Sequence, residues 1–172
     1  MSDATREFRV RDAIESEIDP LATLWYDAWL DAHASILPVA LAQFRTLDSF
    51  RARLGKLLPA VRVVGPPLKP SGFCIIKEAE LYQLFVSAHA RGAGVAAALI
   101  ADAERRLAER GVERGWLDCA IGNDRAARFY EKHGWRRIGV VVSQLETPAG
   151  PFPLEVWRYE KDLRSEPLDI QT

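Results

Sequence analysis

Residues 80–100 read ELYQLFVSAHARGAGVAAALI, and this stretch decides the fold. From Leu81 to Val86 only Gln83 is polar, which is typical of a strand covered on both faces. The apolar residues after the loop recur at three- and four-residue spacing: Val95, Leu99, Ala103 and Leu107. That spacing predicts a helix over residues 94–110. The unit is therefore a strand, a loop of small residues and a helix.

The loop has the features of an anion site. The first backbone N–H groups of a helix have no intrahelical partner, and they lie at the positive end of the helix dipole. Gly92, Gly94 and Ala96 leave these groups unblocked, and Arg91 adds a guanidinium suited to phosphate oxygens. The alternative is that the small residues only allow close packing of the helix on the sheet. From these residues alone both interpretations stay open.

Two known phosphate-binding motifs are alternatives for this loop. A nucleotide P-loop requires a lysine and a Ser/Thr after its last glycine, and Val95-Ala96 follow Gly94 here, which excludes it. The dinucleotide pattern G-x-G-x-x-G/A is matched by residues 92–97, and Asp118 stands where the ribose-binding acid belongs. Its first glycine should follow the strand directly, however, and SAHAR separates Val86 from Gly92.

The same stretch resembles the GNAT superfamily of acyl-CoA-dependent N-acetyltransferases. Arg91, Gly94 and Ala96 meet that family's Q/R-x-x-G-x-G/A signature. Downstream, residues 123–135 read NDRAARFYEKHGW, which is similar to the family's N-x-x-A-x-x-F-Y-x-x-x-G-F/W segment. The resemblance covers roughly residues 72–142. It implies an α+β fold, an α/β/α sandwich whose mixed, mostly antiparallel sheet has about six to seven strands, helices on both faces and one central, splayed parallel strand pair.

The resemblance also implies acetyl-CoA as the acyl donor, without a metal. The pantetheine arm would lie in the gap between strands 81–86 and 116–121, against Leu84, Phe85 and Val86. The diphosphate would lie on Arg91, Gly92, Ala93, Gly94, Val95 and Ala96. Asn123, Ala126 and Phe129 would hold the arm from the other side, although Asn123 also fits a simple helix cap.

Acyl transfer from a thioester to an amine requires two proton transfers. The amine must lose a proton before it attacks, and the departing thiolate benefits from gaining one. The family's tyrosine for the second step matches Tyr130, whose alternative role is to cover the interface between helix and sheet. For the base, Glu80 is the candidate, because several family members carry a glutamate there. There are two alternatives: Glu80 pairs with Lys77, or ordered water acts as the base.

The same resemblance implies residues that contact the acceptor. The first helices of the family line the acceptor cleft, which makes Trp25, Tyr26, Trp29 and His33 candidate acceptor contacts. His89 and His133 are interpreted as surface residues. Many family members form homodimers, and an exposed edge over residues 154–160 would allow strand pairing.

Composition limits the remaining possibilities. The chain has 172 residues, 48% of them hydrophobic, which indicates a single domain over 1–172 with a loose tail over 164–172. Its net charge is −1, so no overall positive field attracts nucleic acid or membranes, and we expect neither as a partner. Met1–Arg9 lacks the apolar core of a signal peptide, so we expect a cytoplasmic protein. Cys74 and Cys119 are expected to be buried, reduced thiols.

The rest of the chain predicts further elements. Residues 8–11 alternate like a strand, and Asp19-Pro20 is typical of a helix start, with Asp19 as the N-cap and Pro20 in the first turn. A second helix is expected over residues 41–58. Further strands are expected over 61–64, 72–76, 137–142 and 154–159, with a short helix over 124–133.

Three functions compete at this stage. The first is an N-acetyltransferase that moves an acetyl group from acetyl-CoA to the primary amine of a small molecule or peptide. The second is a catalytically silent acyl-CoA-binding or regulatory module on the same fold. The third is a dinucleotide-binding oxidoreductase, which predicts a strand that ends directly at Gly92 and binding of NAD.

Overall fold

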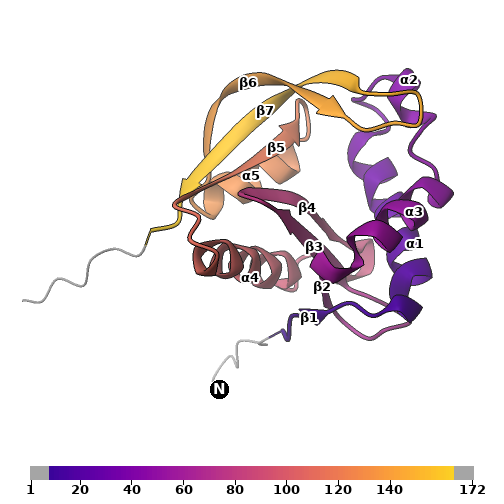
Figure 1. The fold of residues 1–172 in the computed structure, drawn as a ribbon, viewed down its shortest axis with the longest axis horizontal. Helices are drawn as coiled ribbons and strands as arrows, with labels where there is room; N and C mark the ends of the chain where they lie inside the picture. Colours follow the sequence, from indigo (N-terminus) through magenta and orange to yellow (C-terminus); the bar gives the residue numbers. More distant parts are fainter. Residues whose placement is uncertain (1–7, 165–172) are drawn as a thin grey trace, which may run out of the picture.

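The computed structural model describes residues 8–164 and contains one seven-stranded sheet (Figure 1). The strand order is β1-β2-β3-β4-β5-β7-β6, and every neighbouring pair is antiparallel except β4 with β5. The strands are β1 Arg11–Asp12, β2 Val61–Val64, β3 Gly72–Lys77, β4 Glu80–Val86, β5 Arg114–Ala120, β6 Arg136–Leu145 and β7 Phe152–Asp162. The helices are α1 Ile18–His33, α2 Val39–Ala42, α3 Leu47–Leu57, α4 Val95–Glu109 and α5 Asp124–Lys132. Three 3₁₀ turns cover Glu15–Glu17, Leu58–Ala60 and Ala88–Ala90.

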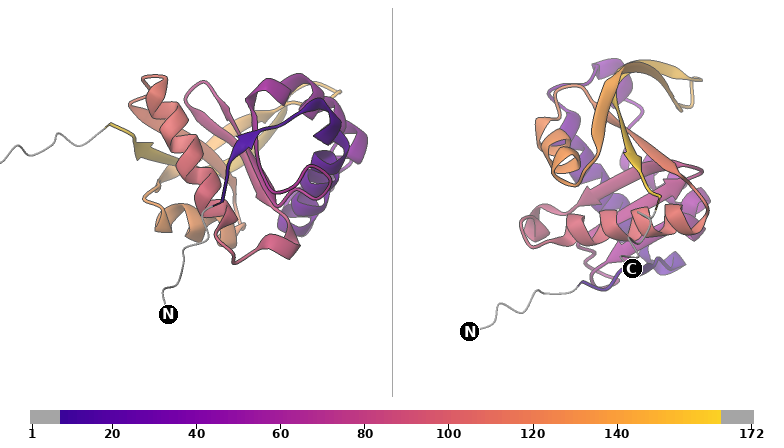
Figure 2. Two further views of the ribbon diagram at one scale, coloured as in Figure 1. Left: turned by 90° about the horizontal axis from the view of Figure 1, so that it is seen from below. Right: turned by 90° about the vertical axis from the view of Figure 1, so that its left-hand side faces the viewer.

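Helices cover both faces of this sheet (Figure 2). On one face α4 and α5 contribute Val95, Leu99, Leu107 and Ala127 to a buried cluster. On the other face α1, α2 and α3 form a second buried cluster that contains Trp25, Leu41, Phe50 and Leu54. The expected α/β/α sandwich with a mostly antiparallel sheet and one central parallel pair is confirmed.

The first helix begins earlier than predicted. Asp19 is not its N-cap, because α1 starts at Ile18 and Asp19 lies within the first turn, where its carboxylate accepts from Arg51 Nε at 2.6 Å. A 3₁₀ turn leads into the helix. The Glu17 carboxylate in that turn is buried against Arg11, at 2.6 Å, which neutralises a charge that could not be buried alone.

The second predicted helix, residues 41–58, is two helices. The Thr46 side chain accepts from the backbone N–H of Ser49 at 3.1 Å, and Ser49 Oγ accepts from the Thr46 N–H at 3.0 Å. This reciprocal cap starts a new helix and therefore separates α3 from α2.

Two predicted strand features are also corrected. The opening strand spans only Arg11–Asp12 instead of residues 8–11. The segment 154–160 is not an edge, because β7 lies between β5 and β6, and β6 is the outer strand. A long β6–β7 hairpin supplies partners on both sides of β7. Of the tail expected over 164–172, all but residue 164 lies outside the described residues.

Candidate active site

The parallel strands β4 and β5 separate immediately after their first paired residues. Their one register pair in the described part of the chain is Glu80 with Trp116. Within β4 the pairing to β3 passes from Leu81 to Gln83, so Tyr82 is an extra residue that forms a β-bulge. A bulge bends its strand and increases the local twist. The bulge lies two residues after Glu80, and past Glu80 the two strands no longer pair.

The start of α4 lies at the end of β4 and is open to solvent. Gly94 is the N-cap with a φ of 95°, and no side chain caps the helix. Residues 91–94 are exposed, and a Cβ at Gly92 would meet no atom within 4 Å. The unpaired N–H groups of the first turn can therefore donate hydrogen bonds to an anionic group.

Two arginines stand beside this helix start. Arg91 Nη2 donates to Asp31 Oδ2 at 2.6 Å, and Arg125 Nη2 donates to the same oxygen at 3.1 Å. The two guanidinium groups lower the pKa of the Asp31 carboxyl group. Arg91 and Arg125 thus come together from opposite sides of the gap between β4 and β5.

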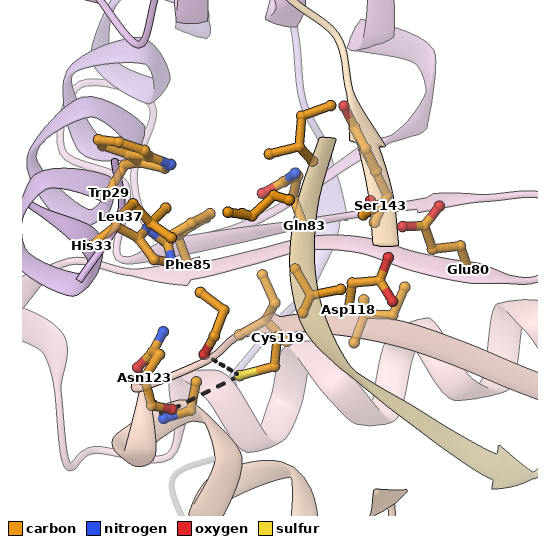
Figure 3. Close-up of a pocket in the computed structure, with 18 of the residues that line it drawn as sticks. Trp29, His33, Leu37, Glu80, Gln83, Phe85, Asp118, Cys119, Asn123 and Ser143 are labelled. Atoms are coloured by element: carbon orange, nitrogen blue, oxygen red, sulfur yellow. Dashed lines mark hydrogen bonds between the residues drawn. The ribbon is translucent and has the colours of Figure 1, made fainter. Parts of the chain in front are cut away.

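A cavity of about 450 Å³ occupies the space where the strands separate (Figure 3). Residues from α1, β4, β5, α5 and the β6–β7 hairpin line it. In the close-up, Trp29 and His33 come from α1, and Glu80 and Asp118 come from the two diverging strands.

The cavity brings together about half of the predicted site residues. Its lining includes Trp25, Trp29, His33, Glu80, Leu84, Phe85, Asn123, Ala126 and Tyr130. It does not include Tyr26, Val86, Phe129 or any residue from Arg91 to Ala96. Tyr26 packs against Phe50 instead, with ring centroids 6.4 Å apart.

Glu80 has an altered acidity. Burial, and then the negative charge of Asp118, raises the pKa of the Glu80 carboxyl group to about 7, while Lys77 and Arg158 act in the opposite direction. Lys77 is the register partner of Glu80 across β3 and β4, but no ion pair joins them within residues 8–164. A carboxyl group with a pKa near neutrality can exchange protons at physiological pH.

Tyr130 and Cys119 are neutral groups in the same cavity. Burial raises the pKa of the Tyr130 phenol further above its ordinary value. Burial also raises the pKa of the Cys119 thiol to about 12, so the thiol stays protonated. Cys119 Sγ lies 3.8 Å from the Asn123 carbonyl oxygen (Figure 3). Both cysteines are buried and free.

Asn123 occupies the position expected of a helix cap. Its Oδ1 accepts from the Ala126 N–H at 3.3 Å at the start of α5, and the residue also lines the cavity. The side chain is therefore held in place by the helix that it begins. The two roles weighed for Asn123 are compatible in this geometry.

The three histidines lie in different environments. His89 is exposed, and its Nδ1 is 2.6 Å from Ser87 Oγ. His133 stacks on Phe129 with ring centroids 4.5 Å apart. His33 lines the cavity, and burial lowers the pKa of its imidazole to about 4, so the ring is neutral at pH 7.

Several cavity residues were not identified from the sequence. They are Arg45, Arg53, Gln83, Asp118, Cys119, Ser143, Gln144 and Arg158. Asp118 was considered only as a ribose-binding acid, whereas in the structure Arg158 Nε donates to it at 2.6 Å on the sheet. The alternation of Asp118 with apolar neighbours in β5 was the available signal for a side chain that faces the gap.

The dinucleotide hypothesis required β4 to end at Gly92. The strand ends at Val86, and a 3₁₀ turn over Ala88–Ala90 follows before the glycines. Residues 68–135 match the acetyltransferase (GNAT) family. The match covers 68 of the 172 residues and includes β3, β4, α4, β5 and α5.

Solved structures agree with this fold. A GCN5-related N-acetyltransferase from Rhodopseudomonas palustris is 17% identical, with a TM-score of 0.73 over 94% of this chain and 99% of that one. The PaiA N-acetyltransferase from Thermoplasma acidophilum, in complex with coenzyme A, is 16% identical, with a TM-score of 0.63 over 94% and 99% of the two chains. The ribosomal-protein-S18-alanine N-acetyltransferase from Escherichia coli is 17% identical, with a TM-score of 0.61 over 96% and 99%. A search of curated proteins found no match.

No helix within residues 8–164 has the length and apolar character needed to cross a membrane. In the same residues, no three His, Cys, Asp or Glu side chains gather in a way that could hold a metal ion.

Proposed function

We propose that this GNAT domain, over residues 1–172, transfers an acetyl group from acetyl-CoA to a primary amine of a small molecule or peptide. The observation that carries the proposal is one cavity at the separation of β4 and β5, lined by both Glu80 and Tyr130. One group has a pKa near 7, and the other keeps its proton at that pH. They match the two proton transfers that the reaction requires.

Residues at the end of β4 and the start of α4 would hold the donor. The exposed N–H groups at Gly94 and beyond, together with Arg91, suit the diphosphate. Past Glu80, the side of β4 that faces β5 has no register partner within the described chain, so an extended pantetheine amide chain fits there. Asn123 and Ala126 line the opposite wall. Acetyl-CoA would supply the thioester that the amine attacks.

The proton transfers follow from the two side chains. Glu80, as carboxylate, takes a proton from the amine, directly or through water, while the nitrogen bonds to the thioester carbonyl carbon. When the carbon–sulfur bond breaks, Tyr130 donates its phenolic proton to the departing sulfur. The products are the acetamide and free CoA. The tyrosinate takes up the second proton that the nitrogen loses as the amide forms, and Glu80 releases the first proton to solvent.

Direct attack is favoured over a relay through Cys119. The thiolate is the nucleophilic form of cysteine, and a thiol with a pKa of about 12 is almost entirely protonated at pH 7. Among residues 8–164 the hydrogen-bond partners of that sulfur are the carbonyl oxygens of Ala120 and Asn123, and neither is an ionised base. The amine therefore reacts with the thioester itself.

Tyr130→Phe tests the assignment. Removal of the proton donor should lower kcat roughly 100-fold, measured as thiol release over an amine panel. The affinity for acetyl-CoA, measured by isothermal titration, should not change. The control is Tyr159→Phe, which removes a buried hydroxyl that accepts from Arg137 outside the cavity. This variant should retain wild-type kcat.

The titration also separates the competing functions. A silent acyl-CoA-binding module would bind acetyl-CoA without thiol release from any amine, and an oxidoreductase would bind NAD. An unchanged kcat in Tyr130→Phe would contradict the role assigned to this tyrosine.

A further inference from the structure

Two arginines at the cavity are not neutralised by a carboxylate. Arg45 lies in the connection between α2 and α3, and Arg53 lies on α3. Both line the cavity, and Arg45 is 7% exposed. Within residues 8–164 neither forms an ion pair, whereas several other arginines do: Arg11, Arg51, Arg62, Arg91, Arg105 and Arg158.

Each of the two guanidinium groups is held by neutral partners. Arg45 Nη1 donates to the Glu146 carbonyl oxygen at 3.0 Å. Arg53 Nη2 donates to the Tyr82 hydroxyl at 2.7 Å, and its Cζ lies 4.4 Å from the ring centroid of Trp25. A guanidinium has five N–H donors, so both side chains keep donors for a ligand.

A third donor lies beside them. Trp25 Nε1 is buried and has no hydrogen-bond partner in the described part of the chain. The Trp25 side chain is 0% exposed and lines the same cavity. A buried N–H without an acceptor costs about 1–3 kcal/mol, so an acceptor brought by a ligand would be stabilised here.

Two positively charged guanidinium groups, those of Arg45 and Arg53, interact at this end of the cavity. Burial, and then the positive charge of Arg53, lowers the pKa of the Arg45 guanidinium to about 10, while Tyr82 and Glu146 oppose this effect. Arg45 is still cationic at pH 7. The Glu146 side chain is exposed and makes no ion pair in residues 8–164. The two guanidinium groups therefore lack the counter-charge that partly buried cations require.

The charges that line the whole cavity indicate which ligand charge would suit it. Four cationic side chains, Arg45, Arg53, Lys77 and Arg158, face three carboxyl groups, Glu80, Asp118 and Glu146. Asp118 is already paired with Arg158. When all three carboxyl groups are ionised, one positive charge is in excess, which suits one carboxylate group on the ligand.

We propose that the acceptor is an amine that also carries a carboxylate, bound by Arg45 and Arg53 with the Trp25 indole N–H. Amino acids and the free C-termini of short peptides belong to this class. The inference rests on the proposed acetyl transfer, because it assigns the acceptor of that reaction. The amine would face Glu80 and Tyr130, and the carboxylate would face the two arginines.

The first test is a comparison of matched acceptors. Amino acids and dipeptides are each assayed beside their C-terminal amides by thiol release from acetyl-CoA. For every pair that is turned over, kcat/KM for the free acid should be at least about tenfold higher than for the amide, because charge-assisted hydrogen bonds are lost in the amide. Equal turnover of acids and amides would overturn the proposal, as would a preference for phosphoethanolamine over its carboxylate analogue.

Variants connect the preference to the arginines. Arg53→Met should reduce the preference for the acid to less than about threefold, whereas Arg53→Lys should keep part of it. Arg51→Met is the matched control on the same helix, since Arg51 is exposed and pairs with Asp19 and Asp48 at the surface. The control should retain the full preference. An unchanged preference in Arg53→Met and in Arg45→Met would contradict the assignment.

A binding measurement separates this inference from the proposed reaction. Calorimetry with CoA-loaded protein should detect the free acids and not their amides, and Arg53→Met should lose this difference. If no amine is acetylated but the acids still bind selectively, the reaction is wrong and the carboxylate site stands. If amines are acetylated without any selectivity for the acids, the carboxylate site is wrong and the reaction stands. If a variant does not fold, acetate and propionate are tested as competitors of the acceptor in the wild-type protein. Competition would support the carboxylate site, and an absence of competition would refute it.

Discussion

At the scale of single residues, the environment of Glu80 determines its chemistry. An exposed glutamate has a pKa of about 4.3 and is a weak base at neutral pH. Here burial and the nearby Asp118 charge raise the pKa to about 7. The cavity thereby converts an ordinary strand residue into a group that can accept a proton from an amine.

The first prediction at this scale concerns pH. Glu80 acts as a base only when it is deprotonated, so kcat should rise with pH and level off above an inflection near pH 7. Glu80→Gln should lower kcat roughly 100-fold and remove this inflection. Rate profiles between pH 5.5 and 8.5 measure both effects.

Asp118→Asn provides the matched control for that prediction. Removal of the neighbouring negative charge should lower the pKa of Glu80 and shift the inflection to lower pH. An inflection near pH 7 that persists in Glu80→Gln would assign the titration to another group or to water.

At the scale of secondary-structure elements, a buried ion pair joins α4 to β2. The Asp102 carboxylate is 5% exposed and accepts from Arg62 of β2 at 3.0 Å and from Arg105 of α4 at 2.9 Å. Arg62 also donates to Asp12 at 2.8 Å, so the connection extends to β1. This arrangement fixes the helix whose N-terminus lies at the proposed diphosphate site.

Asp102→Ala should therefore destabilise the fold. It leaves the largely buried Arg62 without its main counter-charge, and such a loss costs about 3 kcal/mol. Urea unfolding followed by circular dichroism measures the change. The control is Glu109→Ala on the same helix, because Glu109 is 63% exposed and its ion-pair partner in the described part of the chain is the exposed Arg105. Its midpoint should remain that of the wild type, and an equal loss in both variants would contradict the role of Asp102.

At the scale of the whole molecule, the sheet consists of two parts that meet at an incomplete seam. The strands β1–β4 form one part and β5, β7 and β6 the other, with Glu80 and Trp116 as their register pair. The tip of the β6–β7 hairpin reaches the region of α2 (Figure 1), where Arg45 donates to the Glu146 carbonyl. A ligand bound across the seam would contact both parts.

Acetyl-CoA should consequently stabilise the whole domain. A ligand that binds only the folded state at 100 times its Kd contributes about 2.7 kcal/mol. For a chain of this length, that contribution raises Tm by roughly 5–10 °C. Thermal unfolding with acetyl-CoA, and separately with NAD, measures the effect. No rise with acetyl-CoA, or an equal rise with NAD, would contradict the proposed donor site.

Local patterns in the chain were sufficient for much of the fold. The expected strands at 61–64 and 72–76 and the helix at 94–110 agree with β2, β3 and α4 within about two residues. The boundary between α2 and α3 was missed although Thr46 and Ser49 carry a capping signal. The place of residues 154–160 was wrong because strand order depends on contacts between distant segments.

The chain by itself determined the periodicities, the glycines before α4 and the motifs that resemble those of the GNAT family, since these depend on residues close in sequence. Only the tertiary structure decided where β4 and β5 separate, which side chains share the cavity and what pKa Glu80 has. Arg45 and Arg53 show the difference, because their residue types are visible in the sequence and their lack of a carboxylate partner is not. The physical reason is that burial and electrostatic interactions depend on distances between atoms, and residues far apart in the chain come close only after folding.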